Sequence, residues 1–215
     1  MTSGIPGWGN VTVVDHPLVQ HMLTTLRDHR TDSTTFRRVT RQMGLLLGYE
    51  ITRTLPLSRT GIETPLQPMQ APTLAGDVCV VSILRAGNGL LEGMLDLFPR
   101  ASAGHIGLAR DEATLRAEEY YLKLPRNIGA CETILVDPML ATGGSAAAAV
   151  ERLQQAGARS VRFACMLAAP EGLRRLTAAH PDLPIVTAAI DDGLNDRGYI
   201  CPGLGDAGDR FYGTT

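Results

Sequence analysis

Residues 134–145 read ILVDPMLATGGS, and this stretch joins an apolar strand, an acidic residue and a glycine-rich turn. The residues ETILV, 132–136, predict a strand that is buried on both faces. The run SAAAAVERLQQAG, 145–157, predicts a helix that ends at Gly157. A strand, a glycine-rich turn and a helix in this order form the repeating unit of a parallel α/β sheet.

The same rhythm recurs elsewhere in the chain. VCVVSIL, 78–84, is a second apolar run, and the turn RAGNG after it leads into an expected helix LLEGMLDLF, 90–98. Further strands are expected at HIGLA, 105–109, VRFACMLA, 161–168, and PIVTAAI, 184–190. The sequence therefore predicts an α/β fold with about five parallel strands flanked by helices.

The N-terminal third of the chain has a different pattern. Asp15 as N-cap, with Pro17 in the first turn, predicts one helix, and a second is expected to start near Ser33. Four prolines between residues 55 and 76 predict an irregular excursion or an edge hairpin. We expect residues 1–14 to form a flexible extension.

Length and composition indicate one globular domain, 1–215. The chain has 44% hydrophobic and 20% charged residues, and its 20 Lys and Arg balance 22 Asp and Glu. This balance disfavours a nucleic-acid partner, and no stretch predicts a signal peptide or a membrane span, so the expected location is cytoplasmic. Four widely spaced cysteines predict reduced thiols, and Cys79 and Cys165 are expected to be buried within apolar runs.

The turn after residue 136 is the main candidate site. In an open parallel sheet, ligands bind beyond the carboxyl ends of the strands. Residues 142–145 open a helix, so their free backbone N–H groups can hold a phosphate in a chain without net basic charge. Asp137 lies within reach of the vicinal hydroxyls of a sugar whose 5-phosphate fills this cradle. The alternative is that residues 142–145 form only a turn with a helix cap and have no binding role.

Two nucleotide-binding motifs fit this chain poorly. No Lys follows the glycines of residues 142–145, so the turn is not a Walker A loop. GNGLLEG, 87–93, comes near the dinucleotide fingerprint, but Glu92 occupies the position of the third glycine.

The loop resembles the phosphoribosyl-diphosphate (PRPP) loop of type I phosphoribosyltransferases, in the variant of the uracil enzymes. Pro138 stands where most type I relatives carry a second acid. The resemblance extends over HPLV, ILRAG, AAPEGL, AHPD and the long irregular tail GLNDRGYICPGLGDAGDRFYGT. It implies a type I phosphoribosyltransferase fold whose segment 191–215 forms a base-binding hood.

The resemblance also implies roles for individual residues. Arg85, from ILRAG, and Arg110, after the next strand, contact the diphosphate of PRPP, which guanidinium groups match well. The Arg85–Ala86 peptide is often cis in this family. The implied PRPP-binding residues are Arg85, Arg110, Asp137, Pro138, Met139, Leu140, Ala141, Thr142, Gly143, Gly144, Ser145 and Asp206.

Uracil would be read by the tail. By resemblance, Ile200 offers main-chain contacts to the base edge, and Gly205, Asp206 and Ala207 join it, while Tyr199 packs nearby. Asp206 is the residue expected to assist loss of the proton from uracil N1, and with Arg85 and Asp137 it completes the implied catalytic set. Mg²⁺ is expected to arrive with PRPP.

A flexible segment, expected at 111–125, covers the site in the family. Here RAEEY, 116–120, replaces an EPVPY-like stretch, Ser82 stands where a proline often precedes ILRAG, and Asn88 stands where an apolar residue is usual. These departures leave the closure of the site and the base preference open.

Three alternatives stay open. Transfer to a related base or analogue is one; transfer to a purine or orotate predicts the two-acid loop, which Pro138 contradicts. A PRPP-sensing RNA-binding regulator would need a basic face, which a net charge of −2 disfavours. The resemblance further implies a homodimer or larger homo-oligomer, with the apolar face of the first two helices as a candidate interface, and a possible purine-nucleotide (GTP) activator.

Overall fold

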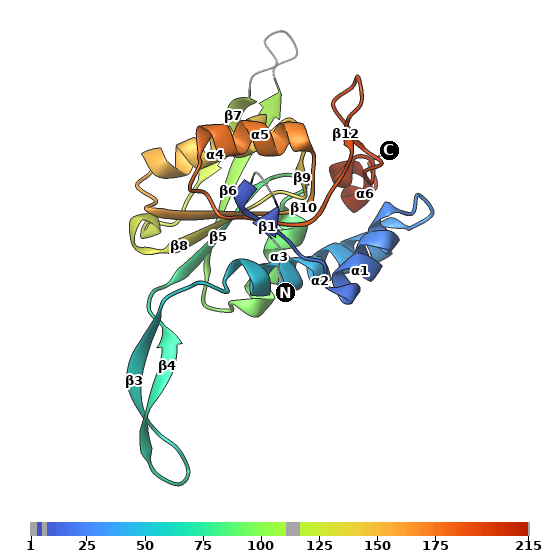
Figure 1. The fold of residues 1–215 in the computed structure, drawn as a ribbon. Coiled ribbons are helices and arrows are strands. Elements are labelled where there is room, and N and C mark those ends of the chain that lie inside the picture. The colour runs from blue at the N-terminus through green and yellow to red at the C-terminus, as the bar shows by residue number, and fades with distance from the viewer. Residues whose placement is uncertain (1–3, 6–7, 111–116, 215) are drawn as a thin grey trace.

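The computed structural model describes residues 4–5, 8–110 and 117–214 (Figure 1). The strands are β1 Gly4–Ile5, β2 Trp8–Val13, β3 Leu57–Glu63, β4 Pro68–Leu74, β5 Val78–Leu84, β6 Ser102–Arg110, β7 Ala117–Lys123, β8 Glu132–Val136, β9 Met139–Leu140, β10 Ser160–Ala168, β11 Ile185–Ile190, β12 Gly193–Leu194 and β13 Ile200–Cys201. The helices are α1 Pro17–Arg27, α2 Ser33–Ile51, α3 Asn88–Leu97, η1 Ile128–Ala130, α4 Gly144–Gln155, α5 Pro170–Ala179 and α6 Ala207–Tyr212.

A nine-stranded sheet forms the centre of the fold, in the order β1-β2-β11-β10-β8-β5-β6-β7, with β9 also paired to β10. Neighbours from β2 through β6 are parallel, and the two edge pairings, β1 with β2 and β6 with β7, are antiparallel. The predicted α/β class is confirmed, and all five predicted strands lie in this sheet.

The sheet contains two parallel strands more than predicted, the two-residue β9 and the longer β2. Trp8–Val13, placed in the expected flexible extension, form β2, where Val11 pairs with Ile185. Val11 is 1% exposed, so this short β-branched run completes the core instead of extending from it.

Helices cover both faces of the sheet (Figure 1). One apolar cluster joins α1, α2, α3 and α6 to the face that carries Val78 and Val80 of β5. The other joins α4 and α5 to the face that carries Cys79 and Val81, which confirms that β5 is buried on both sides. Most apolar residues of α1 and α2 lie in the first cluster and pack inward, while Leu18 and Tyr49 stay exposed, so little of the apolar face is left for the interface that was predicted on these helices.

The strand order reverses between β5 and β8. β5 pairs with β6 on one side and with β8 on the other, while the chain beyond β8 continues away from β6 to β10 and β11. Ligands of open α/β sheets bind in the crevice at such a switch point, beyond the carboxyl ends of the strands. The turn after β5 and the loop after β8 both leave from this crevice.

The proline-rich segment forms a hairpin. β3 and β4 make a separate two-stranded sheet that extends away from the body of the molecule (Figure 1), so the hairpin alternative is confirmed but it does not lie at the edge of the main sheet. A two-stranded ribbon leaves one edge of each strand free, which is why β4 tolerates Pro68 and Pro72.

Two helix starts can be compared with their predictions. α1 begins at Pro17, but its N-cap is His16 and not Asp15: His16 Nδ1 accepts a hydrogen bond from Leu18 N–H at 3.2 Å. Pro17 has no N–H, so the cap must satisfy the next donor. α2 begins at Ser33 as predicted. Within the described ranges, no helix combines the length and hydrophobicity needed to cross a membrane.

Candidate functional site

The loop after β8 is held by the sheet over its first half. Pro138 O accepts hydrogen bonds from the backbone N–H groups of Met166, at 2.9 Å, and Leu167, at 3.1 Å. Leu140 O accepts another from Ala169 N–H at 2.9 Å. Three bonds to β10 and its continuation therefore fix the path between the strand end and the glycines.

The second half of the loop forms the predicted start of a helix. Gly143 is buried and adopts φ +75°, a left-handed conformation that favours glycine, and α4 begins at Gly144. The first helical bond runs from Ala147 N–H to Gly143 O at 3.0 Å. The amides of Gly144 and Ser145 precede this bond, so they are free for an anion at the positive end of the helix dipole.

Asp137 lies at the end of β8, immediately before this loop. Its N–H donates to Ala164 O at 3.2 Å, so the backbone is held by β10. Burial raises the pKa of the Asp137 carboxyl to about 7, and a hydrogen bond from the Met139 backbone only partly opposes this. A carboxyl group with a strongly raised pKa at a topological switch point is a candidate functional group.

The turn after β5 lies against the end of β8. A Cβ built on Gly87 would lie 2.8 Å from Val136 O and 2.5 Å from Ile83 O, so only glycine allows this approach. The cis peptide bond precedes Arg85, at Leu84–Arg85, and not Arg85–Ala86 as the resemblance implied. The difference places the cis bond at the strand end, ahead of a tight turn in which Gly87 N–H donates to Ile83 O at 3.0 Å.

The C-terminal helix α6 contacts the same turn. Tyr212 Oη donates to Arg85 O at 3.0 Å, and the Arg85 guanidinium lies 5.6 Å from the centre of the Tyr212 ring. Asp209 Oδ1 is 3.8 Å from Arg85 Nη2. Sequence reasoning treated this tail as irregular and missed α6, although Asp206 and Gly213 bracket it as ordinary N- and C-terminal caps.

Buried charge holds the tail against α1. Arg27 Nη1 donates to Asp191 Oδ2 and to Gly203 O, each at 2.8 Å, and Gly203 N–H donates to the same Asp191 oxygen at 2.8 Å. Arg210 donates to Leu204 O at 2.8 Å and, across to the chain beyond α1, to Asp28 O at 2.6 Å. These bonds orient the glycine-rich segment between β13 and α6.

The predicted base-binding residues differ in exposure. Tyr199, Gly205 and Asp206 are exposed, whereas Ile200 and Ala207 are 4% and 5% exposed and pack in the apolar cluster that also receives Ala86, Met139 and Ala141. The tail, the β5 turn and the β8 loop thus meet around one cluster. Asp206 caps α6, because its Oδ1 accepts a hydrogen bond from Asp209 N–H at 2.9 Å.

Two departures from the family pattern are linked in the structure. Ser82 Oγ donates to Asn88 Oδ1 at 2.8 Å and lies 2.9 Å from His105 Nδ1 of β6. Ser82 is fully buried, so the polar residue at position 88 satisfies the hydroxyl that replaces a proline.

The expected flexible cover, residues 111–125, is partly a strand. Residues 117–123 form β7, and the Glu119 carboxylate accepts a 2.7 Å hydrogen bond from Arg152 Nε of α4. Pairing with β6 and this ion pair hold β7 in place. Arg110 ends β6, beside β5, but its side chain and residues 111–116 lie outside the described residues.

The site offers carboxylates without a closed metal cage. The described residues contain no group of three or more His, Cys, Asp or Glu side chains arranged to hold a metal ion. Mg²⁺ commonly keeps several waters and takes one or two carboxylates plus substrate phosphates. Asp209 Oδ1 lies 3.8 Å from Arg85 Nη2, so a carboxylate stands beside the turn of Arg85, and this fits a magnesium ion that arrives on its substrate.

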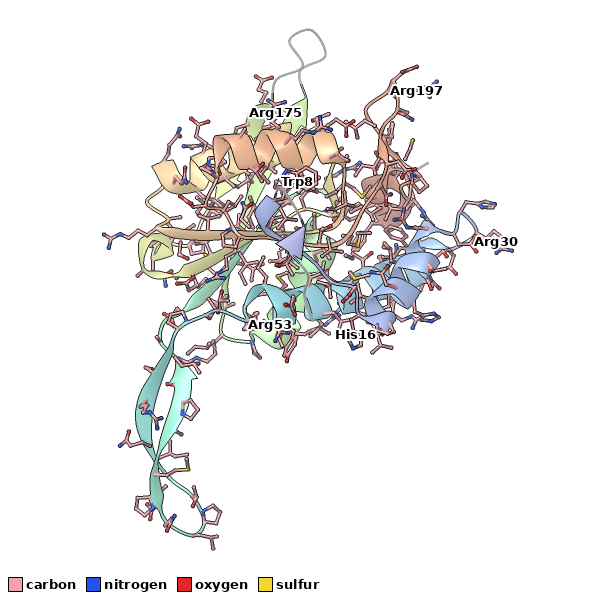
Figure 2. The ribbon with its side chains drawn as sticks, in the orientation of Figure 1. Trp8, His16, Arg30, Arg53, Arg175 and Arg197 are labelled. Carbon is pink, nitrogen blue, oxygen red and sulfur yellow. The ribbon has the colours of Figure 1, made fainter. Side chains whose placement is uncertain are left out.

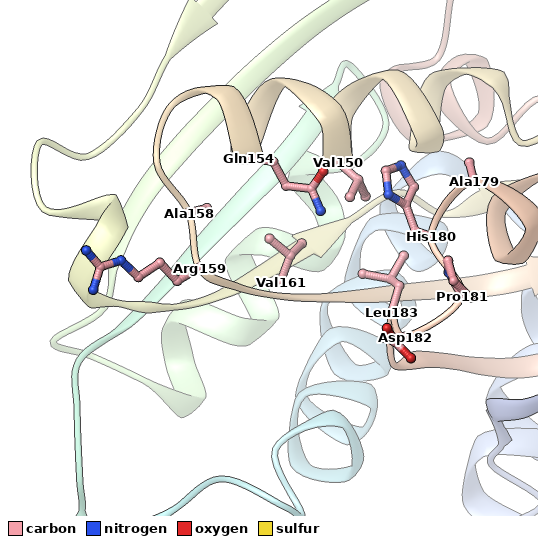
Figure 3. Close-up of a pocket in the computed structure, with 10 residues that line it drawn as sticks. All are labelled: Val150, Gln154, Ala158, Arg159, Val161, Ala179, His180, Pro181, Asp182 and Leu183. Carbon is pink, nitrogen blue, oxygen red and sulfur yellow. The ribbon is translucent and has the colours of Figure 1, made fainter.

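One cavity adjoins the predicted base-binding segment, and another lies away from the predicted site residues. One of about 430 Å³ lies between the later turns of α4 and the end of α5, lined by Val150, Gln154 and His180 among others (Figure 3), away from the start of α4. Another, of about 360 Å³, adjoins the tail, and its lining includes Arg27, Gly205, Asp206 and Asp209. The second cavity marks accessible space at the predicted base-binding segment.

Comparison with known proteins gives consistent results. A family model described as "Uracil phosphoribosyltransferase" matches residues 13–214. The chain is 60% identical over 205 residues to the uracil phosphoribosyltransferase of Mesorhizobium japonicum, covering 95% of this chain and 98% of the relative. It is 57% identical over 206 residues to that of Paracoccus denitrificans, with the same coverage.

Solved structures show the same fold. A protein from Aquifex aeolicus superposes with a TM-score of 0.88 at 36% identity, covering 95% of this chain and 99% of that one. The adenine phosphoribosyl transferase of Trypanosoma brucei superposes with a TM-score of 0.60 at 16% identity, covering 95% of this chain and 91% of that one, a likeness of fold.

Proposed function

The chain belongs to the uracil phosphoribosyltransferase family, and we infer that it transfers the 5-phosphoribosyl group of PRPP to uracil, giving UMP and diphosphate in pyrimidine salvage. One observation supports this assignment: the turn after β5, which carries Arg85, lies against the end of β8, which is followed by Asp137 and the loop proposed to hold the phosphate. Individual residues are proposed below to bind the phosphate, ribose and diphosphate of PRPP and to bind uracil.

The loop after β8 would bind the ribose 5-phosphate half of PRPP. The amides of residues 143–145 and the hydroxyls of Thr142 and Ser145 supply hydrogen-bond donors to the 5-phosphate. Residues 138–141 set the distance between this cradle and Asp137 through their bonds to β10. Asp137, as a carboxylate, would accept hydrogen bonds from the two ribose hydroxyls and fix C1 for displacement.

The diphosphate would leave toward the turn after β5. Arg85 is exposed at this turn and its backbone is held by Tyr212, so its guanidinium can follow the leaving oxygens. Arg110, at the end of the adjacent strand, is proposed as the second diphosphate contact. Mg²⁺, when bound with PRPP, neutralises charge on the diphosphate.

The segment 191–215 is proposed as the hood that presents uracil. The support is its position: α6 packs on the Arg85 turn, and the Arg27–Asp191 pair holds the segment against α1. Main-chain groups of residues 200, 205 and 207 would read the base edge, with Tyr199 beside them. Asp206 is proposed to assist removal of the N1 proton through the carboxylate oxygen that does not cap α6.

Diphosphate release tests this assignment. The purified protein is incubated with PRPP, Mg²⁺ and, in turn, uracil, orotate, cytosine, adenine and hypoxanthine. Uracil is expected to support turnover, and Asp137→Ala to abolish most of it, while Asp182→Asn, at the distant cavity of Figure 3, serves as a matched control with wild-type rates. Turnover with another base and none with uracil would refute the assignment.

We also propose a homodimer or larger homo-oligomer. The β3–β4 hairpin supports this, because it exposes Leu57, Ile62, Leu66 and Met69, with Leu66 94% exposed. Sedimentation of the wild type and of Leu66→Ser compares their association.

Activation by a purine nucleotide such as GTP is proposed from family resemblance and is tested by titrating GTP into the uracil assay. The four free thiols suit a reducing, cytoplasmic compartment.

A further inference from the structure

Helix α5 packs directly on the phosphate-binding loop. A Cβ built on Gly172, in the first turn of α5, would lie 2.5 Å from Ala141 O and 2.6 Å from Leu140 O. Only glycine permits backbone contact this close. The first turn of α5 is therefore fixed against the loop, and the residue one turn later is positioned with it.

That later residue is Arg175, which projects from α5 (Figure 2). A Cβ built on Gly144 would lie 3.3 Å from Arg175 Nη1, 3.6 Å from Cζ and 3.7 Å from Nη2. A Cβ built on Gly143 would lie 3.3 Å from Arg175 Cβ. The guanidinium thus lies over the first residue of α4, beside the amides of the phosphate cradle.

The charge balance at this position favours an anion. Residues 138–145 contain no charged side chain, so no side chain of the loop neutralises the roughly two negative charges that a phosphate monoester carries. Among the described residues, Arg175 forms no ion pair within 4.0 Å. Glu171, one turn earlier on α5, lies toward Gly193, with Oε1 3.1 Å from a Cβ built there.

We propose that Arg175 binds the 5-phosphate of PRPP and of the product UMP, adding a charged, forked donor to the backbone cradle at Gly143 and Gly144. The inference rests on the proposed function of this loop. A guanidinium matches two phosphate oxygens at once and stays charged at every working pH. Arg175 would act on binding, because the 5-phosphate keeps its charge throughout the transfer at C1.

Three variants separate this role from general electrostatics. Arg175→Ala removes the donor, Arg175→Lys keeps the charge without the fork, and Arg174→Ala removes an equally exposed neighbouring arginine that makes none of the contacts to Gly143 or Gly144. Calorimetry then measures the Kd of ribose 5-phosphate and of diphosphate for each variant, and uracil turnover gives KM for PRPP and kcat.

Arg175→Ala is expected to raise the Kd of ribose 5-phosphate and the KM for PRPP by about three- to tenfold. The kcat and the Kd of diphosphate should stay unchanged. Arg175→Lys should recover part of this loss, and Arg174→Ala should match the wild type. The role of Arg175 would be overturned if Arg175→Ala raised the Kd of ribose 5-phosphate and of diphosphate equally, or had no effect on either. It would also be overturned if Arg174→Ala had the same effect as Arg175→Ala. Absence of uracil turnover in the wild type would instead refute the proposed function.

Discussion

Lowering the pH from 8 to 6 should weaken PRPP binding through the Asp137 carboxyl. Burial raises its pKa to about 7, so this side chain is mostly neutral at pH 6 and mostly a carboxylate at pH 8 in the free enzyme. Hydrogen bonds donated by the two ribose hydroxyls favour the charged form and lower the pKa in the complex. Binding must therefore release a proton when the group is neutral.

The size of the effect follows from this pKa. The apparent Kd is multiplied by the factor 1 + 10^(pKa − pH), which is about 11 at pH 6 and about 1.1 at pH 8 for a pKa of about 7. We therefore expect affinity to fall about tenfold across this range. Because the pKa of Asp137 is higher in the folded than in the unfolded state, protonation of this carboxyl stabilises the fold. The stabilisation is complete below the unfolded pKa and is lost as the pH rises through 7.

Calorimetry can isolate this carboxyl from the titration of PRPP itself, whose phosphate groups also gain protons near pH 6. PRPP is titrated into the wild type and into Asp137→Asn at pH 6, 7 and 8, in two buffers of different ionisation enthalpy that report proton release. The amide of Asp137→Asn has nearly the shape of the carboxyl and cannot titrate. The pH dependence that remains in this variant therefore comes from the protonation of PRPP.

The wild type should show about a tenfold larger affinity change than Asp137→Asn, and should release about half a proton more at pH 7. Equal pH dependence in the two proteins would refute the reasoning, because it would mean that Asp137 does not change charge when PRPP binds. A change of the opposite sign would show that the bound state favours the neutral carboxyl.

Three further perturbations test the fixed geometry around the site. Gly143→Ala places a Cβ 2.7 Å from a carbonyl oxygen of α5 at φ +75°, so thermal unfolding should show a loss of about 1–3 kcal/mol, and KM for PRPP should rise. Asp191→Asn leaves the partly buried Arg27 without its charge partner, which should lower stability by about 2–3 kcal/mol in urea unfolding and raise KM for uracil. Tyr212→Phe removes the bond to Arg85 O and should reduce kcat/KM by about two- to fivefold with the unfolding midpoint nearly unchanged, since this bond is exposed.

The periodicity of the sequence predicted most of the elements around the site. VCVVSIL and ETILV could be identified as strands because both of their faces are apolar, and they form β5 and β8 with the predicted bounds. The glycines at 143 and 144 marked the start of α4 because few other residues allow that turn. β2 and α6 were missed because two or three apolar residues carry too little periodicity to stand out in a short segment.

The contacts of the predicted residues depend on pairing between distant segments, which no local pattern encodes. The carboxyl of Asp137 has a raised pKa because β10 and the loop enclose it, and Arg85 meets α6 because Arg27 and Asp191, 164 positions apart, hold the tail in place. Arg175 looks like any exposed helix arginine in the sequence.

The sequence by itself determined the α/β class, the strand-turn-helix unit with its phosphate-binding turn, and the family, since these follow from local periodicity and from residues consecutive in the chain. Only the tertiary structure decided the order of strands, the crevice between β5 and β8, and the side chains that meet there. The physical reason is that burial, charge pairing and backbone approach depend on distances in space between segments far apart in the chain.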